Sequence, residues 1–192
     1  SHRLERGQKA QYANFSGWDI YRSQIQLIAF LEPQRAGDIA QSLYNQARQH
    51  GGVWDRWTHN SGATSVMNGD PSAPAVAGIL AFGARNFDIQ GAFDSLVAAA
   101  TKPTTKDLGK TGCPVSCTGQ RPSLDQWLEH GYIASESHAW GAAAETLEVA
   151  SADFGLAEIA RHLGDGKARE TFLRRADGWR HLFNPKATPE GG

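Results

Sequence analysis

Helical periodicity covers most of this 192-residue chain, and strand signals are scarce. Apolar residues recur at helical spacing in successive segments, which predicts helices over residues 19–31, 36–50, 74–83, 89–101, 123–130, 142–163 and 168–182. These segments alternate between fairly apolar and more charged ones. A ring of paired helices produces this alternation, because its inner helices are buried all round and its outer helices are half solvated. The sequence therefore predicts an all-α fold that forms part of a helical toroid, incomplete in this chain.

Local signals mark the start of two of these helices. Asp88 stands where an N-cap residue would accept a hydrogen bond from the first turn of 89–101. The string "SLDQ", from Ser123 to Gln126, resembles a capping box at the start of 123–130.

Charge and hydropathy exclude two classes of partner. The net charge is −1 and the pI is about 6.6, and acidic and basic residues are interleaved without a basic stripe. Nothing therefore indicates binding to nucleic acid or to an anionic membrane surface. No apolar run reaches the roughly 18 residues that a membrane span requires. The first residues lack the apolar segment of a secretory signal and the only methionine is Met67, so we expect a piece of a longer protein.

The two cysteines, Cys113 and Cys117, are four residues apart in the Gly/Pro-containing loop "GKTGCPVSCTGQRP". They could close a small disulfide ring, bind zinc with partners such as His130 and His138, or remain reduced. The disulfide is favoured, and it would indicate an oxidising compartment.

Three predicted loops, at 11–18, 51–72 and 102–122, are too long and too aromatic to be only connectors. Five tryptophans lie in or beside predicted loops: Trp18, Trp54, Trp57, Trp127 and Trp140. Aromatic rings stack on the C–H faces of sugars, while carboxylates, amides and arginine bind the hydroxyls, so these loops favour a carbohydrate site. The alternative is that the tryptophans are core residues at loop edges and that Asp19 is a helix N-cap.

Glycoside hydrolysis requires two carboxyl groups, one on each side of the scissile bond. Candidates on loops or helix starts, or facing one side of a helix, are Asp19, Asp55, Asp70, Glu148 and Asp153. A turn position explains Asp70 equally well, and pairing with an arginine or a backbone amide explains Glu148 and Asp153. Periodicity does not identify the acid and the base.

Several blocks of the chain resemble glycoside hydrolase family 92, in order from about Tyr12 to Pro185. The blocks are "FSGWDIYRSQIQL", "MNGDPSAPAVAGILAFGARNFD", "RPSLDQWLEHGYI", "ETLEVASADFGLAEIARHLGD" and "RRADGWRHLFNP". The first matches a W-D-x-[YF]-R signature, here Trp18, Asp19, Tyr21 and Arg22. The fourth matches T-L-E-x-A-x-x-D, which includes Glu148 and Asp153. The cysteine-containing loop is similar to that of members from secreting actinobacteria, which implies an extracellular protein with a Cys113–Cys117 disulfide.

The resemblance implies part of a calcium-dependent, exo-acting α-mannosidase that inverts the anomeric configuration and acts on mannose-containing glycans. Members have a β-sandwich domain followed by an (α/α)6 toroid, and residues 1–192 would be the N-terminal portion of that toroid. The family's His-Glu and Asp-x-Asp segments, which serve calcium, substrate and the catalytic base, do not occur in the chain. We therefore expect the calcium ligands and the base outside it, and the isolated chain to be inactive, with marginal stability or a tendency to associate because an incomplete toroid exposes apolar surface.

One position departs from the implied pattern. In the resemblance, the general acid is a glutamate four residues before the methionine of the second block, and that position is Ala63 here. No glutamate lies between Glu32 and Glu129, so a local shift of the alignment does not supply one. Either another group protonates the leaving oxygen, such as Asp55, Asp70 or a residue beyond the chain, or the leaving group is already a good anion.

The sequence thus predicts a fragment of a secreted α-mannosidase, with α-1,2-linked mannose as the expected substrate. Predicted sugar-contacting residues are Trp18, Asp19, Arg22, Trp54, Trp57, Asp70 and Glu148. The alternatives are a mannose-1-phospho-6-mannose phosphodiesterase, a mannose-binding protein without activity, and a toroid that binds only proteins.

Overall fold

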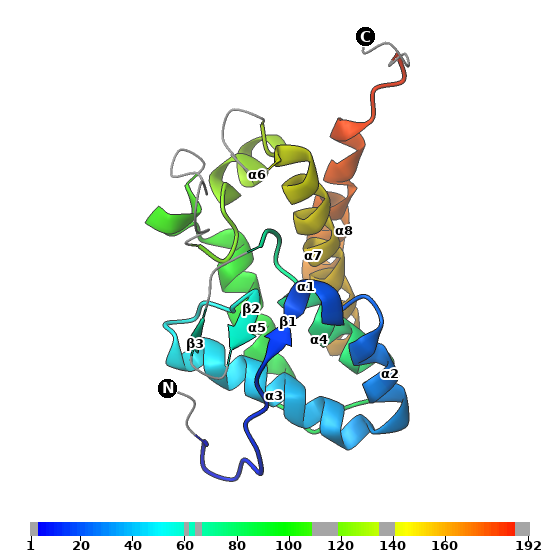
Figure 1. Cartoon of the computed structure of the whole chain (residues 1–192). Coiled ribbons are helices and arrows are strands. Elements are labelled where there is room, and N and C mark those ends of the chain that lie inside the picture. Colours follow the sequence, from blue (N-terminus) through cyan, green and yellow to red (C-terminus); the bar gives the residue numbers. More distant parts are fainter. Residues whose placement is uncertain (1–3, 60–61, 64–66, 109–118, 135–140, 187–192) are drawn as a thin grey trace.

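The computed structural model of the chain describes residues 4–59, 62–63, 67–108, 119–134 and 141–186 (Figure 1). Within these ranges the fold is predominantly helical. The α-helices are α1 (Gly17–Ile20), α2 (Gln24–Leu31), α3 (Pro33–Gln49), α4 (Ser72–Ala81), α5 (Ile89–Thr101), α6 (Leu124–His130), α7 (Ala142–Leu163) and α8 (Gly166–Ala176). The 3-10 helices are η1 (Thr105–Asp107) and η4 (Asp177–Leu182). The prediction of an all-α fold is confirmed.

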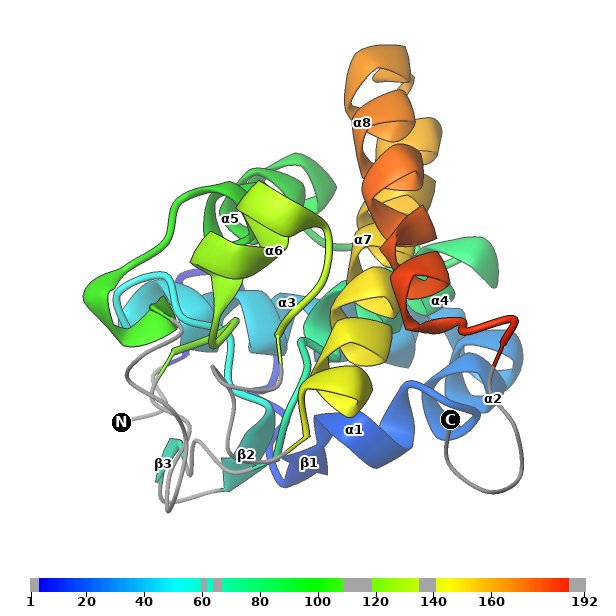
Figure 2. The same cartoon turned by 90° about the horizontal axis from the view of Figure 1, so that it is seen from above.

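The longest of these helices, α7, organises the packing. The helix α8 folds back beside α7, and α4 also packs on α7, as both views show (Figures 1 and 2). Gly155 permits the close approach to α4, because an added Cβ would lie 2.7 Å from N of Pro74 and 2.8 Å from C of Ala73. This contact brings the first turn of α4 directly against α7, next to the candidate site.

The main core forms where α2, α3, α4, α5 and α7 meet. Its side chains are almost completely removed from solvent, among them Ile25, Val76, Ile79, Leu96 and Leu156. Burial of an aliphatic side chain of this size contributes about 1.5–3 kcal/mol. A smaller cluster, which includes Leu124, Trp127, Ile133 and Val149, packs α6 against the N-terminal half of α7.

A small antiparallel sheet joins two of the predicted loops. Its strands are β1 (Phe15–Ser16), β2 (Trp57–His59) and β3 (Gly62–Ala63), in the order β1-β2-β3. Phe15 pairs with Thr58, and Thr58 also pairs with Ala63. The backbone N–H of Gly17 then donates to O of Arg56 at 2.9 Å. The start of α1 is thereby fixed beside the loop that precedes α4.

The predicted helix boundaries are partly confirmed. Asp88 accepts a hydrogen bond from N of Gly91 at 2.9 Å, as an N-cap does, and α5 has the predicted bounds. The predicted capping box does not form, because Ser123 has a φ of 64° and its side chain makes no cap hydrogen bond. The oxygen of the Gln126 side chain instead accepts from N of Ala134 at 3.0 Å.

Two predicted helices are divided in the structure. The segment 19–31 is divided between α1 and α2, with Tyr21, Arg22 and Ser23 outside both. The segment 168–182 begins as α8 and continues as η4. The first break matters for the site, because it redirects the side chains of Tyr21 and Arg22.

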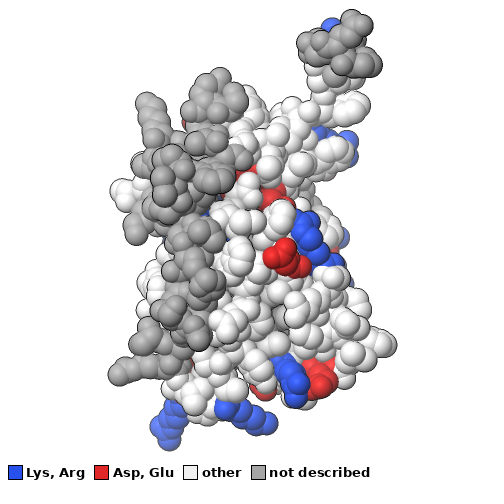
Figure 3. All heavy atoms as spheres, viewed as in Figure 1, with Lys and Arg blue, Asp and Glu red and all other residues white. Residues whose placement is uncertain are grey.

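The surface carries charges in small groups rather than in a large patch of one sign, on the face shown in Figure 3. Several large apolar side chains are exposed on α2, α7 and η4: Leu27, Phe30, Leu31, Leu147, Phe154 and Trp179. Such surface is what the predicted incomplete toroid would expose. Among the described helices, none combines the length and the apolar character needed to cross a membrane.

Candidate functional site

Glu148 of α7 accepts hydrogen bonds from three side chains of the segment that begins with α1. The donors are Nε1 of Trp18 at 3.2 Å, Oη of Tyr21 at 3.0 Å and Nη2 of Arg22 at 2.9 Å. The side chain of Glu148 is 15% exposed and that of Arg22 is 47% exposed. These four residues, here called the Glu148 cluster, therefore form a charged and aromatic group that opens to solvent on its Arg22 side.

The position of Arg22 is fixed on several sides. Its guanidinium carbon lies 4.8 Å from the ring centroid of Trp18 and 4.8 Å from that of Tyr21, and its Nε donates to O of Trp18 at 3.1 Å. Cation–π contacts of this kind orient a planar guanidinium as well as attract it. Burial, followed by the charge of Glu148, raises the pKa of Tyr21 to about 12, so its hydroxyl remains a donor at neutral pH.

The turn before α4 lies directly on α7 next to this cluster. Gly69 has a φ of +80°, and a Cβ added there would lie 2.5 Å from Cβ of Glu148. Its backbone N–H donates to both carboxylate oxygens of Glu145, at 3.1 Å each. Glu145 and Glu148 are three residues apart on α7, so the Gly69 turn contacts two successive acidic residues of one helix.

Glu145 is a buried carboxyl group, with its residue 0% exposed. Burial raises its pKa to about 7, while the charge of Arg56 and the hydrogen bond from Gly69 lower it less strongly. Arg56 is itself buried and donates from Nη1 to O of Gly119 at 2.6 Å. An acidic group with this pKa changes its charge near neutral pH, which few carboxyl groups do.

A buried ionic network lies beneath the turn. Asp153 accepts from Nη1 of Arg121 at 2.6 Å, from Nε1 of Trp127 at 2.9 Å and from Nε of Arg175 at 2.7 Å. Nε of Arg121 also donates to Oδ2 of Asp70 at 2.8 Å. The network ties α6, α7, α8 and the turn before α4 together, so its role is to hold the site's supporting elements in place.

The structure brings only some of the predicted sugar-contacting residues together. Trp18, Arg22 and Glu148 meet in the Glu148 cluster, and Trp57 lies partly buried in β2. Asp19 is exposed within α1 and accepts a hydrogen bond from Oγ of Ser16, so it is not the N-cap. Trp54 is 2% exposed, with its ring stacked on Tyr44, and stacking on a sugar does not fit this burial.

Two other candidate carboxyl groups have buried arginine partners, and the position of the expected general acid lies in the small sheet. Asp70 is 1% exposed and paired with the buried Arg121, so its carboxylate does not face an open cleft. Asp153 has the same kind of buried pairing, so the proximity of Glu148 and Asp153 on one face of α7 does not produce a carboxyl pair. The backbone of Ala63 lies in β3, opposite Thr58.

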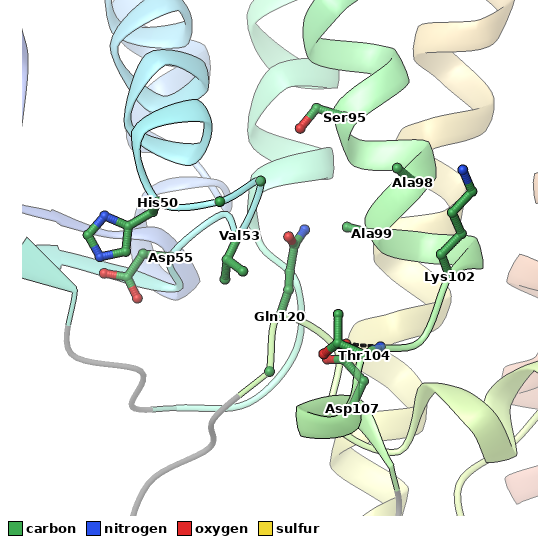
Figure 4. Close-up of a pocket in the computed structure, with 13 residues that line it drawn as sticks. His50, Val53, Asp55, Ser95, Ala98, Ala99, Lys102, Thr104, Asp107 and Gln120 are labelled. Carbon is green, nitrogen blue, oxygen red and sulfur yellow. Dashed lines mark hydrogen bonds between the residues drawn. The ribbon is translucent and has the colours of Figure 1, made fainter.

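A separate cavity of about 550 Å³ lies between the end of α3, α5 and η1 (Figure 4). Its lining includes His50, Asp55, Ser95, Lys102 and Gln120. Two of its polar side chains already bind Trp54, since Ser95 accepts from its Nε1 and Gln120 accepts from its N, both at 3.0 Å. The candidate residue Asp55 lines this cavity, whereas Trp18 and Glu148 do not.

Sequence reasoning missed three residues that organise the site. Tyr21 was part of the matched signature but received no role, Glu145 precedes Glu148 by three positions, and Arg121 lies in a loop. The i, i+3 spacing of the two glutamates is a signal that could have paired them. The predictions for Cys113, Cys117, His138 and Trp140 fall outside the described residues.

Calcium ligands were predicted outside this chain. Across the described ranges, no group of three or more His, Cys, Asp or Glu side chains is arranged to hold a metal ion.

Comparison with known proteins places this architecture in a family. The model of the glycosyl hydrolase family 92 catalytic domain matches residues 2–189. No curated protein matches the chain.

Two solved structures share the fold. The family GH92 inverting mannosidase BT2199 from Bacteroides thetaiotaomicron VPI-5482 has a TM-score of 0.74 and 22% sequence identity, over 92% of this chain and 22% of that one. The family GH92 alpha-mannosidase BT3965 from Bacteroides thetaiotaomicron, in complex with mannoimidazole, has a TM-score of 0.78 and 23% identity, over 92% of this chain and 21% of that one. The chain thus spans about a fifth of the length of these enzymes.

Proposed function

The chain belongs to glycosyl hydrolase family 92, and we propose that it supplies part of the mannose site of an exo-acting, inverting α-mannosidase. The substrate in this proposal is terminal, α-1,2-linked mannose on a glycan. The single observation that carries the proposal is the Glu148 cluster, because it combines a carboxylate, a guanidinium and two aromatic rings at a partly exposed position.

The cluster has unused hydrogen-bonding capacity that suits a sugar. A carboxylate offers about four acceptor sites. Among the described residues, Oε1 of Glu148 accepts from Trp18 and Arg22 and Oε2 accepts from Tyr21, which uses three of these sites and leaves one for a hydroxyl. The half-exposed Arg22 retains further N–H donors, and the two rings provide the apolar surface that a pyranose C–H face requires.

We assign the first contacts with the terminal sugar to Glu148, Arg22 and Trp18. The exposed carboxylate of Asp19 follows Trp18 directly and is the further candidate, as the W-D signature suggests. Trp57 is a candidate for the next sugar. Inversion requires two carboxyl groups about 6.5–9.5 Å apart with a water between, and we assign the base and the calcium ligands to segments outside this chain. We propose that the enzyme is secreted.

A second candidate function is favoured by Ala63. If the general acid of the family belongs at this position, alanine there fits a substrate whose leaving group is already an anion, such as mannose-1-phospho-6-mannose. A third outcome is binding without turnover.

One experiment separates these functions. The full-length enzyme receives an α-1,2-linked mannobioside and a mannose-1-phospho-6-mannoside in the same tube, with and without a calcium chelator, and proton NMR follows the products. Release of β-mannose from the mannobioside, stopped by the chelator, is the expected result. Cleavage of the phosphodiester alone establishes the second candidate, and binding of both without cleavage contradicts an enzymatic function.

A further inference from the structure

Glu145 and Glu148 lie one helical turn apart on α7 but differ in exposure and in hydrogen-bond partners. Glu148 is partly exposed and receives donors from the α1 segment. Glu145 is fully buried, and both of its oxygens accept the same backbone N–H, that of Gly69. A buried carboxylate is costly, so its retention here requires a compensating interaction.

The Gly69 turn contacts both glutamates: its amide binds Glu145 and its backbone lies against Glu148. The backbone of Gly69 lies so near Glu148 that an added Cβ would be 2.5 Å from Cβ, 3.0 Å from Cγ and 3.2 Å from Oε2 of that residue. The turn therefore limits the rotamers open to Glu148. Whatever holds the Gly69 turn on α7 also fixes the direction in which the Glu148 carboxylate points.

We propose that Glu145 is a positioning residue of the mannose site: by binding the Gly69 amide, it holds the turn that directs the Glu148 carboxylate toward Trp18, Tyr21 and Arg22. Glu145 does not touch the sugar, and it acts through Gly69 and Glu148. This inference rests on the proposed function of the Glu148 cluster.

The hydrogen bond between Glu145 and the Gly69 amide depends on pH, because neighbouring charges affect the ionisation of Glu145. Arg56 attracts its carboxylate, while Glu148 and Asp70 repel it. The ionised form binds the Gly69 amide more strongly than the neutral form does, because hydrogen bonds to charged acceptors are about twice as strong. The turn is therefore held most firmly above the pKa of about 7 that burial gives this group.

A double-mutant cycle on the full-length enzyme tests the inference. The variants are Glu145→Gln, Glu148→Gln and both together, and kcat/KM for the mannobioside is measured from pH 5 to 9 together with Tm. Glu158→Gln is the matched control, since Glu158 lies on the same helix and, within the described part of the chain, forms its ion pair with Arg161 of the next turn at 2.9 Å.

We expect Glu145→Gln to lower kcat/KM by about 10- to 100-fold at pH 8, the size of effect that a small misplacement causes, and to remove a step near pH 7. In the Glu148→Gln background the same substitution should have almost no further effect on kcat/KM.

A fall in Tm with wild-type kcat/KM and an unchanged pH profile would show that Glu145 is only structural. If Glu148→Gln itself leaves kcat/KM unchanged, the proposed site fails, whatever Glu145 does. If Glu148→Gln impairs the enzyme and Glu145→Gln acts equally in both backgrounds, the positioning role alone is overturned.

Discussion

Nη2 of Arg22 lies 2.9 Å from Oε1 of Glu148, although 126 residues separate them in the sequence. This pair joins the break between α1 and α2 to the N-terminal half of α7. Since Arg22 is 47% exposed, the interaction is screened by solvent and contributes only about 0–1 kcal/mol to stability. Stability therefore does not account for the pair, and sugar binding is the role that we propose for it.

The substitution Arg22→Ala should therefore separate activity from stability. It removes donors and cationic charge from the Glu148 cluster, and we expect kcat/KM to fall at least about tenfold, which corresponds to about 1.4 kcal/mol, while Tm changes little. Steady-state kinetics and calorimetry on the full-length enzyme measure the two effects. Arg35→Ala is the control, because Arg35 forms a comparably exposed pair with Glu32 at 3.1 Å and should affect neither quantity. Unchanged kinetics for Arg22→Ala would remove this residue from the site.

Asp153→Asn should have the opposite profile, with a large loss of stability. The carboxylate accepts from Arg121, Trp127 and Arg175, and Arg121 is fully buried. Removing one partner from a buried ionic network costs about 3–5 kcal/mol, because the remaining charges lose their compensation. Denaturant unfolding measures the cost, and Asp177→Asn, in the exposed pair with Arg180, should change stability by less than about 1 kcal/mol. Equal effects of the two substitutions would contradict the network described here.

Gly69→Ala tests the turn that lies on α7. The φ of +80° is unfavourable for any residue with a Cβ by about 1–2 kcal/mol, and the new atom would overlap the stem of Glu148. We expect both Tm and kcat/KM to fall. Gly166→Ala is the matched control at the start of α8, where an added Cβ meets nothing within 4 Å, and there Tm should stay constant or rise slightly. A tolerated alanine at position 69 would mean that the turn does not constrain Glu148.

The raised pKa of Glu145 predicts a pH dependence of stability. The native state holds this proton up to about pH 7, whereas the unfolded state releases it near pH 4.5, so the native state binds more protons between these values. Stability from this group is complete below about pH 4.5 and is lost as the pH rises through about 7. The Glu145→Gln variant has no group that titrates at this position, so it does not lose this stability as the pH rises. The free energy of unfolding of the variant minus that of the wild type should therefore rise by about 3 kcal/mol from pH 4 to pH 8. A constant difference across this range, by urea unfolding, would contradict the buried carboxyl described here.

Sequence signals predicted the helices whose bounds depend on hydrophobic periodicity and on capping by a nearby side chain. The periodicity of 142–163 gave the bounds of α7, and Asp88 caps α5 as its residue type and position predict. The break at Tyr21 was not predictable from periodicity, because it reflects side chains that bind Glu148 of a distant helix. Ser123 has the residue type of an N-cap, but its left-handed backbone prevents the capping geometry.

The site was only partly predictable for the same reason. Sequence motifs identified Trp18, Arg22 and Glu148, which do meet, but they could not distinguish the buried Trp54 from an exposed ring. Arg121 and Asp70 come together across 51 residues, and this contact explains why the Asp70 carboxylate is a structural partner in the described chain. Residue type and spacing indicate what a side chain can do, and tertiary contacts decide which side chains remain available.

A crystal structure of the full-length enzyme with mannoimidazole would test the proposed sugar site. We expect the mannose-like ring within hydrogen-bond distance of the Glu148 cluster or the adjacent Asp19, with Arg22 still on the rings of Trp18 and Tyr21. An inhibitor bound with none of Trp18, Asp19, Arg22 or Glu148 in contact would show that this cluster is not part of the sugar site.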